Sequence, residues 1–334
     1  MIINIIFNQQ LFYFISYYSG VSILGCFDII GDIHGFSTEL IQLLTSLDYK
    51  INEDGCYSHK NRKAVFVGDF IDRGNGQKSV IDIVKAMVEN GSALAVMGNH
   101  EFNAISYHTL HPSTKKPLRK HTKDNTHQHQ AFLNEFTNET ELDEAIEWFK
   151  TLPLFLELDE IRIIHACWND EAIASIKNEL DDKNCIKDAF LIAANTKGTY
   201  QFDSIETLLK GVELKLPGNA SFKDSYGKSR QYIRMKWWPC TDLSYKSVAV
   251  APKSVIESLP EINVPVALFN KYQYEVQCKP VFFGHYWFTG APKVQAKNVA
   301  CLDYSVAKNG VLMAYRWDKG DKTISDNKLI QALT

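Results

Sequence analysis

Five short stretches of the sequence place oxygen and imidazole ligands at points where apolar runs end. They are 31–35 (GDIHG), 68–74 (GDFIDRG), 98–101 (GNHE), 164–167 (IHAC) and 283–285 (FGH). Together they offer carboxylate, amide and imidazole groups, a mixed set that suits two divalent cations bridged by a shared carboxylate and a hydroxide. Attack of that hydroxide on phosphorus is the chemistry such a centre performs, so the sequence predicts hydrolysis of a phosphoester.

The spacing of the candidate ligands suggests how they divide between the two cations. Asp32 and His34 are two residues apart, so on an extended strand end both side chains point to one side and can share a cation with Asp69. Asp69 has two carboxylate oxygens and can bridge. The ligands predicted for the second cation are Asp69, Asn99, His165 and His285. We expect Mn²⁺. Fe and Zn are alternatives, because oxygen and nitrogen ligands discriminate poorly among divalent metals.

Alternating strands and helices are predicted to position the first three stretches. Three apolar runs are typical of buried strands, and two amphipathic runs between them are typical of helices. In chain order these runs are 27–31, 38–47, 64–67, 80–88 and 93–97. A β-α-β-α-β order predicts parallel strands with right-handed crossovers, whose carboxyl ends gather the ligands at one edge.

Four later runs continue the pattern. Residues 162–164 and 281–283 are expected to be strands that end at the last two histidine stretches. Residues 299–302 and 311–315 are expected to form a closing β-hairpin, with Asn309 near its turn.

The motifs GDIHG, GDFIDRG and GNHE, followed by isolated histidines, resemble those of the calcineurin-like metallophosphoesterases. Within that superfamily they are similar to the branch of Ser/Thr phosphoprotein phosphatases and bacterial diadenosine-tetraphosphatase-like enzymes. The resemblance covers residues 27–305. It implies an α/β fold, a four-layer sandwich of two mixed β-sheets flanked by helices, with a dinuclear metal site at the carboxyl ends of the strands.

The resemblance also implies roles for residues beside the metals. His100 would be the general acid that protonates the leaving oxygen, with Asp72 holding it as imidazolium. Arg73 would bind two phosphoryl oxygens through its planar fork. A second arginine clamp is expected between the last two metal histidines, where Arg230 and Arg234 both stand. We favour Arg234, because an apolar segment follows it, and the choice between the two remains open.

The chain departs from the protein phosphatases around its last two histidine stretches. Bulky residues at 166–168 (ACW) stand where those enzymes have paired glycines, and 286–287 (YW) follow the last stretch. The interval between the two stretches is also longer than usual. It predicts an insertion around 170–275 that acts as a lid or specificity loop.

These features lead to three hypotheses about function. The first is a Ser/Thr phosphoprotein phosphatase that acts on a phosphorylated protein or peptide. The alternative is a dinucleoside polyphosphate hydrolase, which needs aromatic side chains to stack on a base. Phe102, the pair 237–238 (WW) and Trp287 are candidates, although such residues are more often core. The third is a catalytically silent module that binds phosphorylated ligands.

Two charged segments have simpler interpretations. The basic, histidine-rich stretch 115–129 is expected to be a solvated loop that leads into a helix at 130–136, with contact to a polyphosphate or phosphopeptide as the alternative. The acidic run 141–147 is expected to be an exposed helix face.

Composition limits the class of protein. The 334 residues carry a formal charge of −3, so no global basic field is present and binding to duplex nucleic acid is not expected. Seven scattered cysteines without a CxxC pair favour reduced thiols in the cytoplasm. The composition does not indicate an oligomeric state.

The N-terminal segment 1–26 is apolar and carries no charged side chain. Polar residues interrupt it, and no basic residue precedes its apolar part, so we expect an extension outside a single domain at 27–334. A targeting segment or membrane anchor, and an extension packed on the domain, are the alternatives. Membrane contact is expected only if residues 1–26 act as an anchor.

Overall fold

The structure is a computed structural model that describes residues 25–332 except 219, 224–226, 228 and 241. Apart from its last two residues, the apolar extension predicted at 1–26 lies outside the described residues. Within the described part of the chain, no helix has the length and apolar character needed to span a bilayer.

The first sheet combines the strands predicted in the N-terminal part of the chain with strands from its C-terminal end. Its strand order is β15-β16-β1-β4-β5, with β17 beside β16. The strands are β1 (Phe27–Ile30), β4 (Lys63–Phe66), β5 (Ala93–Ala95), β15 (Asp303–Tyr304), β16 (Val311–Trp317) and β17 (Leu329–Gln331). Strands β1, β4 and β5 are parallel and β16 is antiparallel to β1, so the predicted parallel unit is confirmed within a mixed sheet. The connecting helices are α2 (Ser37–Ser46) and α3 (Gln77–Glu89).

The second sheet has the strand order β14-β13-β7-β6. Its strands are β6 (Phe155–Glu157), β7 (Arg162–Ile164), β13 (Val281–Phe283) and β14 (Val299–Cys301). Strand β13 is parallel to both β7 and β14, whereas β6 is antiparallel to β7. Both sheets are therefore mixed, and the strands that precede the last two histidine stretches lie side by side.

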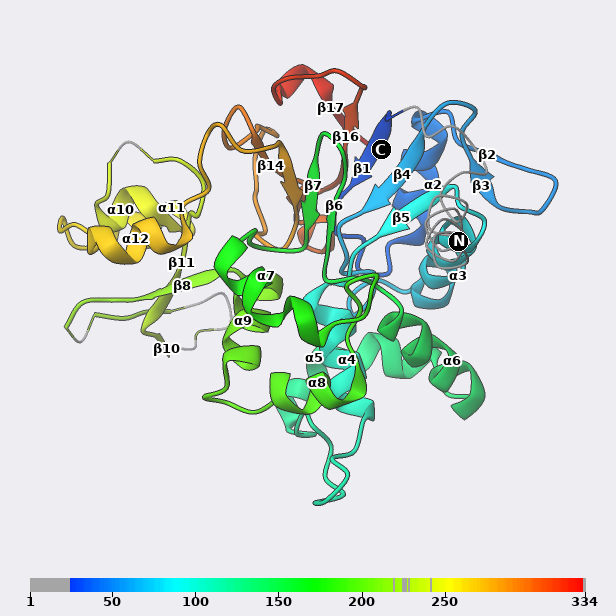
Figure 1. Ribbon diagram of the computed structural model, residues 1–334, viewed down its shortest axis with the longest axis horizontal. Helices are drawn as coiled ribbons and strands as arrows, with labels where there is room; N and C mark the ends of the chain where they lie inside the picture. Colours follow the sequence, from blue (N-terminus) through cyan, green and yellow to red (C-terminus); the bar gives the residue numbers. More distant parts are fainter. Residues whose placement is uncertain (1–24, 219, 224–226, 228, 241, 333–334) are drawn as a thin grey trace, which may run out of the picture.

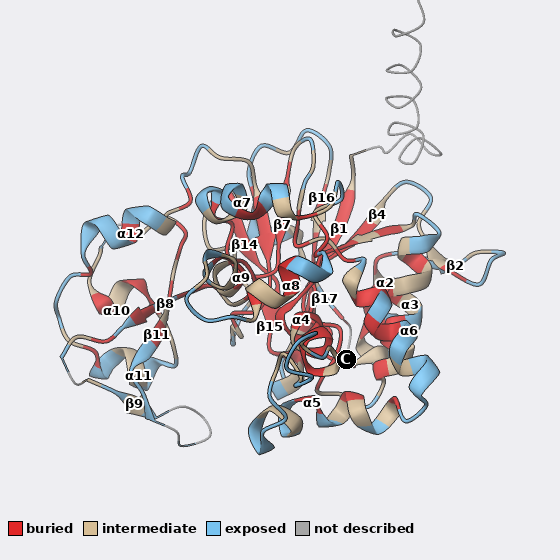
Figure 2. Ribbon diagram, turned by 60° about the horizontal axis from the view of Figure 1, so that its bottom comes forward, coloured by how far each residue is buried: buried red, intermediate tan, exposed pale blue. Residues whose placement is uncertain are grey.

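The two sheets pack against each other because successive residues of each strand face opposite sides. In the core between the sheets, Val65 of β4 belongs to the same cluster as Phe282 of β13. The next residues, Phe66 and Phe283, belong to the larger core on the helix side. The strands accordingly form the buried centre of the molecule in Figure 2. Helices lie outside both sheets, with α2 and α3 against the first (Figure 1).

The remaining elements connect or extend the sandwich. Helices α4 (Asn99–His108), α5 (Lys123–Glu135) and α6 (Glu139–Lys150) follow β5, and the short pair β2 (Lys50–Ile51) and β3 (Tyr57–Ser58) precedes β4. After β7 come α7 (Asp170–Ile176), α8 (Asp188–Ala194) and α9 (Tyr200–Lys210). Helix α5 begins seven residues before the predicted start at 130, so residues 123–129 of the predicted basic loop are helical.

The described residues between 212 and 272 form what we call the side lobe, which lies to one side of the sandwich (Figure 1). It contains the sheet β12-β11-β8 and the pair β10-β9. Its elements are β8 (Val212–Lys215), β9 (Phe222–Lys223), β10 (Ser229–Arg230), β11 (Tyr232–Met235), α10 (Tyr245–Val248), β12 (Ala249–Val250), α11 (Lys253–Ser258) and α12 (Val266–Tyr272). The side lobe falls within the interval for which an insertion was predicted.

The predicted closing hairpin is confirmed only near its turn. The two-residue strand β15 pairs antiparallel with β16, and Asn309 between them has a left-handed φ of 60°. Strand β14, however, pairs in parallel with β13 in the other sheet. The chain changes sheets at Leu302, whose N–H donates to the carbonyl of Phe283 and whose side chain fills the core between the sheets. Burial of this residue in the inter-sheet core overrides the local hairpin pattern.

A buried ion pair holds β1 to its neighbours. The side chain of Asp28 is fully buried and accepts hydrogen bonds from Arg62 Nε at 3.1 Å and Arg316 Nε at 2.9 Å. Arg62 directly precedes β4 and Arg316 lies in β16, so one carboxylate links three adjacent strands.

We expect Asp28→Ala to lower the free energy of unfolding by about 3–5 kcal/mol, because two arginines would lose their shared buried partner. Urea unfolding followed by circular dichroism measures this change. The matched control is Glu147→Ala, which removes an exposed carboxylate paired with Lys150 and should leave the unfolding midpoint unchanged. Equal stability of the two variants would contradict the prediction.

Candidate metal centre

The five ligand-bearing stretches converge where strands of both sheets end. The first three follow β1, β4 and β5 of the first sheet, and the last two follow β7 and β13 of the second. Every predicted ligand is at most 8% exposed: Asp32, His34, Asp69, Asn99, His165 and His285. The structure therefore brings all six predicted ligands to one buried edge of the sandwich.

Asp69 lies at the middle of this cluster. Its Oδ2 is 3.7 Å from Nε2 of His34, and its Oδ1 is 3.4 Å from Nε2 of His165. Two groups of ligand atoms, each within 4.8 Å of one another, share Asp69: one adds His34 and His100, the other His165 and His285. Such a position suits a carboxylate that bridges two cations, as the sequence predicts.

The hydrogen bonds around the cluster leave ligand atoms directed into it. Nδ1 of His34 bonds to the carbonyl of Ile71 at 2.9 Å, and Nδ1 of His165 bonds to the carbonyl of Val67 at 2.8 Å. These bonds fix each imidazole with Nε2 towards the centre. Asn99 Oδ1 is 3.1 Å from Nε2 of His165.

Several buried polar atoms of the cluster have no hydrogen-bond partner among the described residues. They are Oδ1 of Asp32, Nε2 of His34 and Nδ1 of His285. An unpaired buried polar atom costs free energy, and two cations, one bound by Asp32 and His34 and the other by His285, would satisfy all three. Burial, and then the charges of Asp303 and Asp69, raise the pKa of Asp32 well above its usual range. A cation would favour the ionised carboxylate, so the residues present fit two divalent ions.

Close backbone approach and a left-handed backbone shape the site. A Cβ on Gly284 would lie 1.8 Å from Oδ1 of Asp32, so only glycine allows this contact. Four site residues adopt left-handed φ values: His34 (52°), Asp69 (54°), Asp72 (79°) and His285 (68°). Such conformations cost free energy and occur where surrounding structure over-determines them, commonly at functional sites.

The predicted general acid and its partner are in contact. Nδ1 of His100 lies 2.7 Å from Oδ2 of Asp72, and its Nε2 lies 3.9 Å from Oδ2 of Asp69. Burial lowers the pKa of His100, but the charges of Asp69 and Asp72 outweigh burial and raise it overall. The imidazolium form that a general acid requires is therefore favoured.

The two candidate arginine clamps are in different surroundings. Nη1 of Arg234 donates to the carbonyl of His285 at 2.9 Å, which brings β11 of the side lobe to the metal cluster. Arg230 is exposed on the β9–β10 pair. The geometry therefore supports Arg234 as the clamp. The guanidinium of Arg73 is partly buried, and its Nε has no partner among the described residues.

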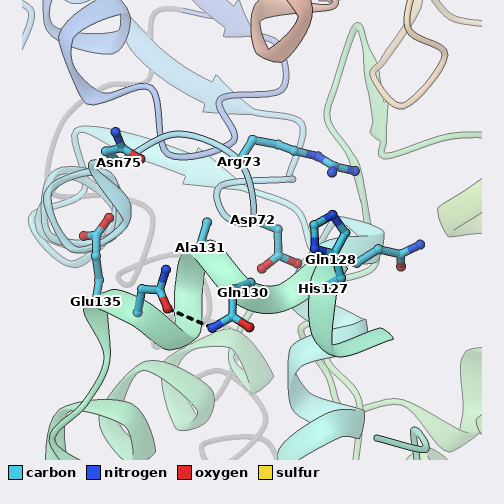
Figure 3. A pocket seen from close by; sticks show the side chains of 9 residues that line it. Asp72, Arg73, Asn75, His127, Gln128, Gln130, Ala131 and Glu135 are labelled. Atoms are coloured by element: carbon cyan, nitrogen blue, oxygen red, sulfur yellow. Dashed lines mark hydrogen bonds between the residues drawn. The ribbon is translucent and has the colours of Figure 1, made fainter. Parts of the chain in front are cut away.

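A cavity of about 340 Å³ opens beside Asp72, the partner of the general acid. Figure 3 shows Asp72 and Arg73 on one side of it and side chains of α5 on the other. Amide groups dominate the α5 side, where Gln130 Nε2 donates to Asn134 Oδ1 at 2.8 Å.

Two residues that support the site were missed by sequence reasoning. His129 belongs to the stretch expected to be a solvated loop, yet it is 4% exposed and its Nδ1 lies 2.7 Å from Oδ1 of Asp72. Its position one segment after the general-acid motif was the available signal. Glu101, the last residue of GNHE, accepts the backbone N–H groups of Asp69 at 2.9 Å and Gly98 at 2.9 Å. It thereby joins the loops after β4 and β5.

The aromatic candidates for base stacking divide by burial. Trp237 and Trp238 are 0% and 4% exposed, and Phe102 is 4% exposed, so all three are core residues. Trp287 is partly exposed, and its ring centroid is 5.6 Å from that of His34. The bulky segment after the last histidine stretch therefore places one aromatic side chain at the rim of the cluster.

Chelation of divalent cations is expected to abolish hydrolysis. When bound, two cations lower the pKa of a water between them and neutralise charge on the phosphoryl oxygens. The test is to dialyse the protein against EDTA, assay p-nitrophenyl phosphate hydrolysis, and then add Mn²⁺ back. Metal content is measured on the same samples by mass spectrometry. Full activity in a sample without metal would contradict the prediction.

The chain is similar to several known proteins. A symmetrical bis(5'-nucleosyl)-tetraphosphatase from Proteus mirabilis is 26% identical over 301 residues, which cover 87% of this chain and 93% of that protein. An asymmetrical bis(5'-nucleosyl)-tetraphosphatase from Oceanobacillus iheyensis is 35% identical over 140 residues, 42% of this chain and only 54% of that protein. Among solved structures, a serine/threonine phosphatase from Saccharomyces cerevisiae aligns over 93% of this chain and 79% of its own, with 12% identity and a TM-score of 0.48.

The sequence profile described as calcineurin-like phosphoesterase matches residues 27–285, which include every predicted metal ligand. This match covers well over half of the chain. The mixed α/β sandwich is the fold of that family, and its members are dinuclear metal-dependent hydrolases. The chain therefore belongs to the calcineurin-like phosphoesterase family and is a hydrolase of phosphoester or phosphoanhydride bonds.

Proposed function

We propose that this hydrolase cleaves dinucleoside tetraphosphates. The sequence analysis placed a Ser/Thr phosphoprotein phosphatase first and this activity second. The curated relatives support the second, because both proteins described above are named bis(5'-nucleosyl)-tetraphosphatases and one aligns over 93% of its length.

The observation that carries the proposal is the surroundings of Trp287. Its ring lies at the rim of the cluster, with Arg73 Cζ 5.5 Å and Lys308 Nζ 4.3 Å from the ring centroid. An aromatic face can stack on a nucleobase. The positively charged side chains of Arg73 and Lys308 suit a polyphosphate. A phosphorylated serine or threonine side chain offers no base to stack.

The remaining residues have roles that fit cleavage of a phosphoanhydride. Arg73 and Arg234 would bind non-bridging phosphoryl oxygens. His100 would donate the proton on Nε2 to the leaving phosphate oxygen, and Asp72 would hold the imidazole through Nδ1.

The deciding experiment compares kcat/KM for diadenosine tetraphosphate and a phosphothreonine peptide at equal Mn²⁺ concentration. We expect the nucleotide to be the better substrate. Chromatography of its products separates symmetrical cleavage, which yields two ADP, from asymmetrical cleavage, which yields ATP and AMP. A higher kcat/KM on the peptide would make the protein a phosphoprotein phosphatase and overturn the proposal. Metal-independent peptide binding without turnover would instead indicate the silent binding module.

Trp287→Ala is expected to raise KM for diadenosine tetraphosphate about tenfold or more, because base stacking on an aromatic side chain contributes about 1–3 kcal/mol per base. Steady-state kinetics on p-nitrophenyl phosphate, which has no nucleobase, should change little. Trp287→Phe keeps an aromatic face and serves as the control, with most of the affinity retained. Equal losses on both substrates would show that Trp287 supports the metal cluster and not the base.

A further inference from the structure

Two imidazoles share the carboxylate of Asp72. His100 Nδ1 lies 2.7 Å from Oδ2, and His129 Nδ1 lies 2.7 Å from Oδ1. The backbone N–H of Asp72 donates to Oε1 of Gln77 at 2.8 Å. Burial opposes ionisation, but the hydrogen bonds from His100 and His129 lower the pKa of Asp72 to about 2. The carboxylate is therefore ionised and accepts from both rings.

His129 is itself fixed within α5. Its ring stacks on Phe132 with centroids 4.7 Å apart and planes 18° apart. Its Nε2 lies 3.2 Å from Nε2 of His108. Burial, and then the charges of His129 and His121, lower the pKa of His108 to about 4, so this ring is neutral at pH 7.

Asp72 accepts a hydrogen bond from Nδ1 of His129, so this ring presents a proton at Nδ1 to the carboxylate. The result is a connected series, His108 to His129 to Asp72, that meets His100 at the second carboxylate oxygen. It joins α4, α5 and the loop after β4.

A carboxylate that accepts a hydrogen bond at only one oxygen can rotate about its terminal torsion. The imidazole that donates this hydrogen bond then changes its orientation as well. A second hydrogen bond at Oδ1 fixes the plane of Asp72 and therefore the ring of His100. Orientation matters because a misplacement of about 1 Å in a reacting group can cost about 10²-fold in rate. We propose that His129 is a positioning residue for the general acid, which holds Asp72 in the plane that directs Nε2 of His100 at the leaving oxygen. The inference rests on phosphoester hydrolysis by this site and on the role of His100, and it is independent of the identity of the substrate.

Two substitutions separate the hydrogen bond from the packing. His129→Phe keeps the stacking on Phe132 and removes the donor to Asp72. His129→Asn places an amide N–H near the position of Nδ1 and loses the stacking. If His129 only fills space, the Phe variant should be the more active; if it positions Asp72, the Asn variant should be.

The assay uses phenyl phosphate and p-nitrophenyl phosphate, which contain no nucleoside. Phenolate is the poorer leaving group, so its departure depends more on protonation by the general acid. We expect His129→Phe to lower kcat on phenyl phosphate about 10–100-fold, as loss of a partner that orients a site residue commonly does, with KM nearly unchanged. The loss on p-nitrophenyl phosphate should be much smaller, and His129→Asn should restore most of the rate.

Controls keep the result independent of folding and of substrate identity. Manganese content and melting temperature should match those of the unsubstituted protein. In an Asp72→Asn background, His129→Phe should have little further effect, because the two residues act through one contact.

Should His129→Phe not fold, His129→Gln, whose amide extends towards the Nε2 side, replaces it. Equal losses on both aryl phosphates, or a Phe variant more active than the Asn variant, would overturn the inference. A preference for phosphopeptide over dinucleotide would overturn only the proposed function.

Discussion

Asp69→Asn is expected to lower kcat/KM by at least about 10³-fold while the protein remains folded. The substitution replaces Oδ2, which faces His34, with an amide NH₂ group and removes the charge shared by both halves of the cluster. Loss of about 4 kcal/mol of transition-state stabilisation corresponds to this factor. Burial opposes ionisation of Asp69, yet the imidazoles of His165 and His100 hold its pKa well below its usual range. The imidazoles around Asp69 thus favour its ionised form.

The fold should tolerate Asn at this position for two reasons. Oδ1 of Asp69 accepts the backbone N–H of His100 at 2.9 Å, and an amide oxygen can accept the same bond. Asn is also among the residues that adopt a left-handed backbone most readily. Kinetics, metal content and thermal melting should be measured together. The matched control is Asp143→Asn, which removes an exposed carboxylate from α6 and should leave all three unchanged. An Asp69→Asn protein with full turnover would refute the bridging role.

His100→Asn is expected to lower kcat by about 10²–10⁴-fold, the usual contribution of general acid catalysis. The Asn side chain can still donate to Asp72, but it provides no proton at the position of Nε2. The loss should be greatest for substrates with poor leaving groups. Steady-state assays across a series of aryl phosphates measure this, and the dependence of rate on leaving-group pKa should become steeper.

Metal binding provides the control for the second prediction. His100 lies close to Asp69 and His34, and one group of potential ligand atoms includes it. If His100 acts only as the general acid, the Asn variant should bind as much Mn²⁺ as the unsubstituted protein. Loss of metal in parallel with activity would instead make His100 a ligand.

The sequence predicted the parts of the fold that local patterns determine. The strands ending at Asp32 and Asp69 and the helices between them follow from apolar periodicity, and glycine-flanked motifs marked the strand ends. The pairing of β14 with β13 could not be predicted, because it depends on the burial of Leu302 between two sheets. Tertiary packing decided this pairing against a local hairpin pattern.

The ligands of the candidate site were predicted from the sequence, but the residues that support them, His129 and Glu101, were not. Each ligand lies in a short motif, so its role could be inferred from neighbours in sequence. His129 is 57 residues from Asp72, and only the docking of α5 brings the two together. The sequence likewise did not show which of the three tryptophans considered for stacking is accessible. Trp237 and Trp238 are core residues, and Trp287 lies at the rim.

The left-handed backbone at four site residues has an evolutionary consequence. Asn, Asp and His are the non-glycine residues that adopt this conformation most readily, and they are also the side chains that ligate divalent cations. Backbone geometry and ligand chemistry therefore select from the same small set of amino acids. A single Asp-to-Asn change, such as Asp69→Asn, is expected to remove catalysis while satisfying the same backbone. The architecture thus offers descendants of such a hydrolase a short mutational path to a folded protein that still recognises phosphate but no longer cleaves it.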